Sequence, residues 1–170
     1  MAPTDISMRW ERIAGAVYFV LYLMILTSLV DYVSNTYPID PGAATWRYGA
    51  LGILGQFLPT PLFAVALILL LASALYQRGH VRFVAVFSAV MALALVLGMV
   101  SFTLDAVQVR ADVPMDQKGL FDFAVARSLF KLFTSAAAFA LCALAGRRVL
   151  AVMAEREPRP KEGKPLVVGS

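Results

Sequence analysis

Arg127 and Lys131 are the two residues of this chain whose charge and spacing best suit an ion pair or an anion-binding site. They stand four residues apart before the last apolar run, so a helix there places both side chains on one face. Asp31 and Asp105 end the first and third apolar runs and are expected on the same side of the molecule. We predict an ion cluster of these four side chains, because unpaired charge near lipid is costly. The alternatives are a pocket for a phosphate, a lipid headgroup or an anionic glycan carrier, and plain snorkelling to the interface.

The same helix face continues into small residues, which are Ser135, Ala138 and Cys142. Small residues allow two membrane helices to approach closely, so this stripe is expected to pack against a neighbouring helix. Cys142 is the only cysteine of the chain, which excludes an internal disulfide. Its thiol is expected to pack as a small hydrophobic group.

His80 is the only histidine, and it lies between Arg78 and Arg82 in a short polar stretch between two apolar runs. An imidazole there could ligate a metal or the magnesium of a chlorophyll-type pigment. We favour a solvated turn histidine, because His80 is expected in a turn beside Arg78 at the cytoplasmic surface. One histidine and one cysteine also exclude a His/Cys metal cage within one chain. No metal and no cofactor are therefore expected, while bound lipids are expected and pigment contact stays open.

The sequence contains no catalytic motif. G-x-S-x-G, a P-loop, H-E-x-x-H and C-x-x-C are absent, and no apolar run holds paired carboxylates. We therefore predict that the protein is not an enzyme. Ionisable residues are also absent from the middle of each apolar run, which argues against a proton pump or an ion transporter.

The composition is that of an integral membrane protein. Hydrophobic residues make up 60% of the 170 residues and charged residues 15%, whereas soluble domains are about half apolar and about a quarter charged. The net charge of +4 does not indicate a nucleic-acid partner, because the charges lie between and outside the apolar runs. We predict an all-α membrane protein with four transmembrane helices at about residues 13–30, 60–77, 83–104 and 120–146.

A break at Pro59-Thr60-Pro61 precedes the second span. Thr60 is expected to cap the following helix and Pro61 to occupy its first turn, so residues 44–58 form a separate short helix at the membrane interface. One kinked helix through both segments is the alternative. Gly79 is expected to cap the end of the second span. The aromatic residues predicted to anchor the protein at headgroup level are Trp10, Trp46, Tyr48 and Tyr76.

Lysine and arginine are distributed unequally between the two sides that four spans define. Ten lie in the N-terminal segment, the turn after the second span and the C-terminal tail, and five lie on the opposite side. Cytoplasmic segments carry the excess of positive charge, so both termini are predicted to be cytoplasmic, in a bacterial inner membrane. Residues 1–154 then form the transmembrane domain, and residues 155–170 form an extended tail that is expected to dock on a partner.

One stretch carries a family resemblance. It contains Trp46-Arg47-Tyr48, Leu51, Leu54, Gln56-Phe57-Leu58, Pro59-Thr60-Pro61 and the apolar run from Leu62 to Leu71. In these residues, and in the position of the outer loop 107–131, the chain resembles the HpsJ-like small membrane proteins of cyanobacteria. The resemblance implies four spans and a role beside polysaccharide-secretion or exosortase systems, and it supplies no catalytic residues.

The features together favour an accessory or structural subunit of a larger bacterial membrane complex, of photosynthetic, respiratory or secretory type. The small-residue faces and the missing catalytic chemistry are the reasons for this prediction. The alternative is an HpsJ-like protein that binds a lipid or a glycan carrier through Arg127 and Lys131. The expected partners are other membrane protein subunits and lipids.

Overall fold

The computed structural model describes residues 3–155, with side chains from Ile13 onward. This part of the chain contains helices and no strand, so the predicted all-α fold is confirmed. The elements are, in order, α1 (Pro3–Asn35), α2 (Ala44–Phe57), α3 (Pro59–Ala74), α4 (Arg78–Ala111), the short 3-10 helix η1 (Met115–Gln117) and α5 (Lys118–Glu155). Three helices are long and apolar enough to cross a membrane, and α2 with α3 makes a fourth crossing if the two count as one broken span.

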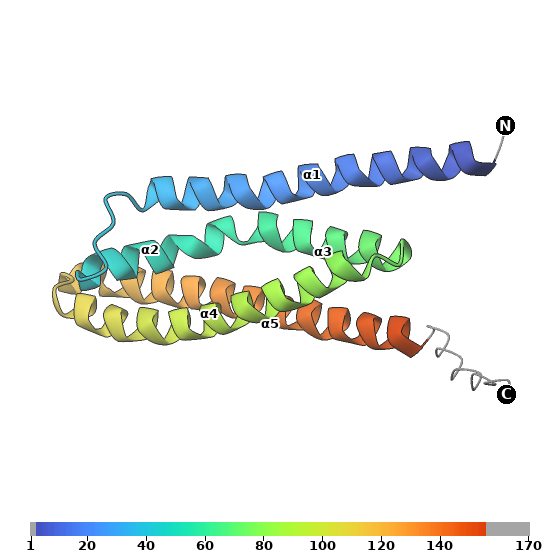
Figure 1. The fold of residues 1–170 in the computed structure, drawn as a ribbon. Helices are drawn as coiled ribbons and strands as arrows, with labels where there is room; N and C mark the ends of the chain where they lie inside the picture. Colours follow the sequence, from blue (N-terminus) through green and yellow to red (C-terminus); the bar gives the residue numbers. More distant parts are fainter. Residues whose placement is uncertain (1–2, 156–170) are drawn as a thin grey trace, which may run out of the picture.

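The helices run lengthwise beside one another (Figure 1). α1 lies along α2 and α3, which return in the opposite direction, and α4 and α5 form a long antiparallel pair joined by the turn around η1. α1 begins and α5 ends at the same end of the bundle. An even number of crossings requires this arrangement, so the geometry is compatible with the four predicted spans.

α2 and α3 meet at Leu58 with a bend of 44° between them. The predicted separation into two helices is confirmed, but α3 begins at Pro59, and no side chain caps its start. Proline suits this first position because the N–H that it lacks would have had no helical acceptor. α2 lies lengthwise against α4 and α5 (Figure 1), so the pair has the shape of a broken span rather than of a helix turned flat onto the membrane surface.

Pro61, the second proline of the break, leaves a backbone carbonyl in need of a donor. It has no N–H to offer to the carbonyl oxygen of Phe57, four residues earlier. The Ser28 hydroxyl of α1 donates to that oxygen at 2.7 Å, and Ser28 is buried. The break in the second span is therefore also a point at which α1 is hydrogen-bonded to the bundle.

We expect Ser28→Ala to lower the free energy of unfolding by about 1 kcal/mol, because the Phe57 carbonyl loses its donor. Reversible unfolding of the purified chain in mixed detergent micelles measures the change. Thr27→Ala is the matched control, because the exposed Thr27 hydroxyl donates only to the Met24 carbonyl of its own helix. The control is expected to change stability by less than about 0.5 kcal/mol. Equal losses in both variants would contradict the role given to Ser28.

The face through which α5 packs is rotated slightly from the predicted stripe of small residues. Ser135, Ala138 and Cys142 are half-buried and flank the interior. The fully buried positions of this stretch are Leu132, Ala136, Phe139, Ala143 and Gly146. α4 comes so close at Gly146 that a Cβ atom built there would lie 2.9 Å from the Cβ of Ala85. The stripe therefore borders the contact between α4 and α5 instead of forming its centre.

Some predicted boundaries shift because the helices continue past the apolar runs. α4 extends beyond residues 83–104 at both ends, and α5 continues to Glu155. Gly79 is not the cap after α3, because it lies in the first turn of α4. The residue with a left-handed backbone in this turn is Tyr76, with φ 55°. The tail after Glu155, its docking on a partner and the side chain of Trp10 lie outside the described residues.

Candidate functional site

Asp105 is buried on α4, and its partner is Arg47 in the first turn of α2. The Arg47 guanidinium donates from Nε to Oδ2 at 3.1 Å and from Nη2 to Oδ1 at 2.7 Å. Asp105 is 3% exposed. The predicted pairing of Asp105 with Arg127 or Lys131 is therefore wrong. α2 packs on α4, and this packing places Arg47 against the Asp105 carboxylate instead.

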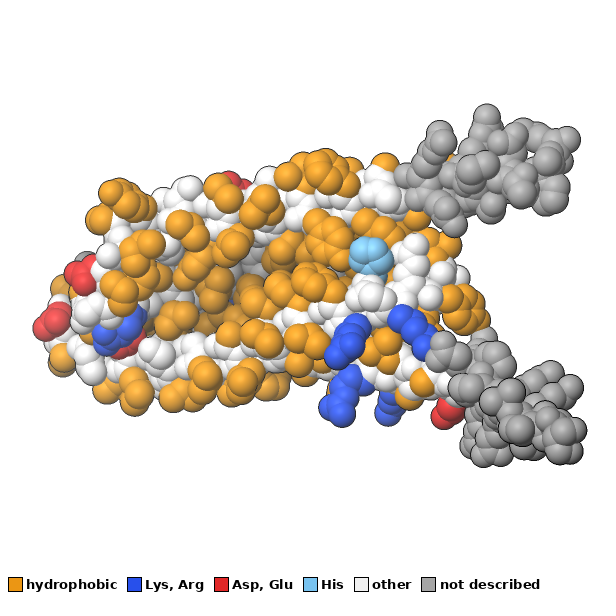
Figure 2. Space-filling view, in the orientation of Figure 1, with side chains coloured by type: hydrophobic (Ala, Val, Ile, Leu, Met, Phe, Trp, Pro, Cys, Tyr) orange, Lys and Arg blue, Asp and Glu red, His pale blue; other side chains and the backbone are white. Residues whose placement is uncertain are grey.

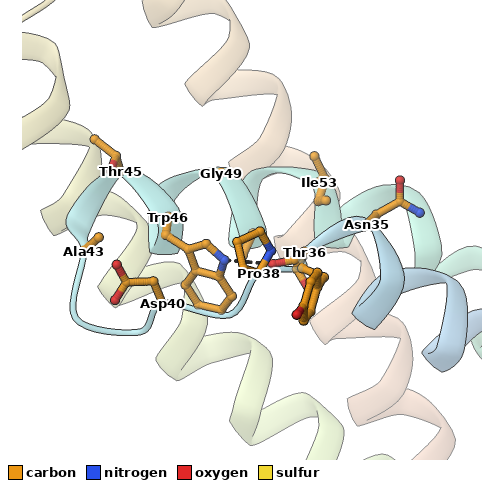
Figure 3. A pocket seen from close by; sticks show the side chains of 11 residues that line it. Asn35, Thr36, Pro38, Asp40, Ala43, Thr45, Trp46, Gly49 and Ile53 are labelled. Carbon is orange, nitrogen blue, oxygen red and sulfur yellow. Dashed lines mark hydrogen bonds between the residues drawn. The ribbon is translucent and has the colours of Figure 1, made fainter.

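Arg47 also holds the loop between α1 and α2. Its Nη1 donates to the carbonyl oxygens of Pro41 and Gly42 at 2.9 and 3.1 Å. The indole N–H of Trp46 donates to the Thr36 carbonyl at 2.8 Å, at the other end of the loop (Figure 3). The loop and the start of α2 enclose an open pocket of about 610 Å³, whose polar and aromatic lining includes Asn35, Thr36, Tyr37, Asp40, Thr45 and Trp46.

Sequence reasoning missed Arg47 as a site residue, although a signal was present. Arg47 is the only charged residue from residue 41 to residue 77. A lone cation in so long an apolar stretch needs an anionic partner or water, and Asp105 is the carboxylate that ends the third apolar run. The isolation of Arg47 in this apolar stretch indicates that it needs an anionic partner, and the packing of α2 on α4 identifies that partner as Asp105.

A second ion pair joins α4 to α5 near their connecting turn. Nε of Arg110 donates to Oδ1 of Asp122, and Nη2 donates to Oδ2, both at 2.8 Å. Both side chains are about half exposed, so water screens this pair. Asp31, which was predicted to join the ion cluster, is exposed and makes no ion pair with any described residue.

Arg127 and Lys131 lie together, as predicted, but on a different surface from Asp105. They line an open pocket of about 460 Å³ where α5 passes the break between α2 and α3. The other lining residues are Gly55, Gln56, Pro59, Thr134 and Ser135, none of which carries a negative charge. Within the described part of the chain neither cation forms an ion pair, so the predicted four-residue cluster is not formed.

His80 lies in the first turn of α4 and bridges α4 to α1. Its ring stacks on Tyr18 with 4.1 Å between the ring centroids, and its Nδ1 is hydrogen-bonded to the Tyr22 hydroxyl at 2.9 Å. The prediction of a solvated turn histidine is therefore wrong in part, because the ring is half-buried and packs on one side against α1. Among the described residues no three His, Cys, Asp or Glu side chains are placed to hold a metal ion.

Two of the predicted interfacial anchors take part in packing. Tyr48 stacks between Phe102 and Phe121, with ring centroids 5.1 and 5.4 Å apart, and thereby joins α2 to α4 and α5. Trp46 is half-buried over the α1–α2 loop. Tyr76, in the turn between α3 and α4, is 59% exposed.

A groove separates α1 from α4. No Cα atom of α1 lies within 8 Å of a described Cα atom of α4 or α5, and the rings of Tyr18 and Tyr22 cross the gap at one end. Figure 2 shows a hollow along this line, bordered by hydrophobic side chains. Part of it is a cavity of about 180 Å³ lined mainly by apolar side chains, among them Ile25, Leu29, Leu54, Phe57, Phe87 and Met91.

No protein-family model, curated protein or solved structure matches this chain. Its function must therefore be inferred from the side chains, pockets and surfaces described above. The resemblance to HpsJ-like proteins stays a prediction. Two residues that carry it, Trp46 and Arg47, are the ones that hold the α1–α2 loop in place.

Proposed function

We propose that the chain is a non-catalytic membrane protein that serves as an accessory or structural subunit of a larger bacterial membrane complex. The groove between α1 and α4 is the observation that carries this proposal. α1 packs on α2 and α3 but stays apart from α4 and α5 over the described residues, so the bundle is open on one side. An apolar transmembrane helix of another subunit is the occupant that suits a lengthwise apolar groove in a membrane.

The side chains beside the groove fit such a partner. Leu29 of α1 lines the cavity in the groove, and Val86 and Val90 of α4 line an adjoining hollow that also contains Phe87 of this cavity. All three side chains are apolar and more than half exposed. The pair of Tyr22 and His80 closes one end with a hydrogen bond, which fixes the distance between α1 and α4 there. A partner helix would therefore meet a surface of fixed width, which reduces the entropy lost on association.

The proposed location is the bacterial inner membrane with both termini in the cytoplasm. The excess of lysine and arginine at one end supports this orientation. Arg147 and Arg148 are exposed near the end of α5, at the end of the bundle where α1 begins.

Photo-crosslinking in intact cells tests the accessory role. A photoreactive amino acid replaces Leu29 or Val90 beside the groove, and Leu141 on the exposed side of α5 serves as the control position. We expect one discrete protein adduct from the two groove positions and lipid adducts alone from Leu141. Lipid adducts alone at all three positions would overturn the proposal, because the groove would then face the bilayer.

A second candidate is the HpsJ-like alternative, a protein that binds a lipid or a glycan carrier. The pocket that holds Arg127 and Lys131 is the observation that favours it. The two candidates use different surfaces, the α1–α4 groove and the junction of α2 with α5. They can therefore be tested separately in the same protein.

A further inference from the structure

We propose that Arg127 and Lys131, together with Gln56 and Ser135, bind the phosphate of a lipid headgroup in the outer leaflet. This inference gives the second candidate function a defined ligand and does not depend on the accessory role. Three observations carry it: the lack of carboxylate partners, the hydrogen-bonding groups around the two cations, and the position of the Lys131 stem. The depth of the two cations adds an argument that rests on the proposed orientation.

The depth of the two cations follows from the geometry of α5. A helix rises about 1.5 Å per residue, so Arg127 and Arg147 are separated by about 30 Å along α5. The hydrocarbon core of a bilayer is about 30 Å thick. In the proposed orientation, with Arg147 placed at the cytoplasmic edge, Arg127 would reach the opposite edge, and Lys131 would lie one turn deeper. The two charges would then lie at the level of the outer phosphates and just below it.

The carboxylates that could neutralise the two cations are engaged elsewhere or distant. Asp105 is held by Arg47, and Asp122 is held by Arg110. The pocket around Arg127 and Lys131 has no acidic residue in its lining. Cations at the membrane edge need an anionic partner or water, and phosphate oxygens at this depth are such partners.

The neutral side chains of the pocket supply further donors. Gln56 and Ser135 make no side-chain hydrogen bond with other described residues, so their amide and hydroxyl groups are available. The Thr134 hydroxyl is already engaged with the carbonyl oxygens of Phe130 and Lys131. Two cations with an amide and a hydroxyl match a phosphate group, which offers several acceptor oxygens and accepts charge-assisted hydrogen bonds.

Gly55 positions the stem of Lys131 at the junction of α2 and α5. A Cβ atom built on Gly55 would lie 3.0 Å from the Cβ of Lys131, so the two helices touch at this point. Lys131 is half-buried against α2, whereas Arg127 is exposed. The start of the Lys131 side chain is therefore constrained, and this side chain lines the same pocket as Arg127.

Native mass spectrometry of the full chain in an uncharged detergent tests this site. The probe is phosphatidylglycerol, and diacylglycerol with the same acyl chains is the comparison lipid without a phosphate. We expect one saturable phosphatidylglycerol site with at least about tenfold higher affinity than for diacylglycerol, and at least about a tenfold loss in Arg127→Gln/Lys131→Gln. Arg147→Gln, which removes an exposed cation from the other end of α5, is the matched control and should change the affinity less than about threefold.

Further measurements show whether the bound phosphate belongs to a lipid or to a soluble ion, and whether a variant that loses binding is still folded. Competition by inorganic phosphate would support a site that also accepts a soluble phosphate, and retained lipid binding without competition would support the lipid headgroup alone. Arg127→Lys/Lys131→Arg keeps both charges and should keep binding. If the double glutamine variant does not fold, Arg127→Gln alone replaces it, because Arg127 is exposed. Unchanged phosphatidylglycerol affinity in the folded glutamine variant, or equal diacylglycerol affinity, would overturn the proposal.

Discussion

Gly146→Leu is expected to lower the free energy of unfolding by on the order of 3 kcal/mol, because overpacking at a rigid contact forces two helices apart. A Cβ atom at this position would lie 2.9 Å from the Cβ and 3.4 Å from the Cα of Ala85. The Ala85 methyl is attached directly to the α4 backbone and cannot rotate away. Relief therefore requires movement of α4 itself, and unfolding in mixed micelles measures the cost.

Two further variants separate the clash from a general effect of leucine. Gly15→Leu is the control, because nothing lies within 4 Å of the Cβ position of Gly15, and it should change stability by less than about 0.5 kcal/mol. Gly146→Ala combined with Ala85→Gly moves the methyl from one helix to the other and should be more stable than Gly146→Ala alone. A destabilisation by Gly15→Leu as large as that by Gly146→Leu would show that the α4–α5 contact is not the cause.

Arg47→Ala is expected to lower the Tm of the detergent-solubilised chain by about 5 °C, because a buried carboxylate loses its cation. The Asp105 carboxylate would keep only the Ser101 hydroxyl, 3.4 Å from Oδ2. The carbonyl oxygens of Pro41 and Gly42 would lose their donor in the same variant, which should also loosen the α1–α2 loop. Faster proteolysis within residues 36–43 measures that second effect.

Arg110→Ala is the control for this ion pair. It breaks the contact with Asp122, in which both side chains are about half exposed to solvent. Exposed pairs contribute little, so its Tm should fall by no more than about 2 °C. Asp105→Ala combined with Arg47→Ala should cost less than the sum of the two single changes, because the pair acts as one unit. Additive losses would argue against a shared Arg47–Asp105 interaction.

The pairing of Asp105 illustrates the limit of sequence reasoning in this fold. The sequence predicts one cluster of Asp31, Asp105, Arg127 and Lys131, because it places all four at one side of the membrane. Being at the same depth does not fix how each helix is rotated about its axis. The structure turns Asp105 toward α2 and Arg127 toward the junction with the α2–α3 break, so the same four charges divide between two surfaces.

His80 shows the same limit for a residue that was expected in solvent. The local sequence around it is polar, and a turn of α4 begins there. The side chains that contact the ring are Tyr18 and Tyr22, and Tyr22 lies 58 residues earlier in the chain. Nothing in the neighbouring residues signals this contact, because it depends on how far α1 extends past the start of α4.

The sequence by itself determined the all-α fold, the long apolar helices and the helix break at Pro59-Thr60-Pro61. These features depend on local properties. The length of an apolar run sets whether a helix can cross a membrane, and a proline, which has no N–H, breaks the interior of a helix but suits the first turn of the next one. The tertiary structure alone decided that Arg47 meets Asp105, that Ser28 donates to the Phe57 carbonyl and that α1 stands apart from α4. Those contacts join residues 29 to 58 positions apart, and they depend on helix rotation and register, which the packing of large and small side chains between helices sets.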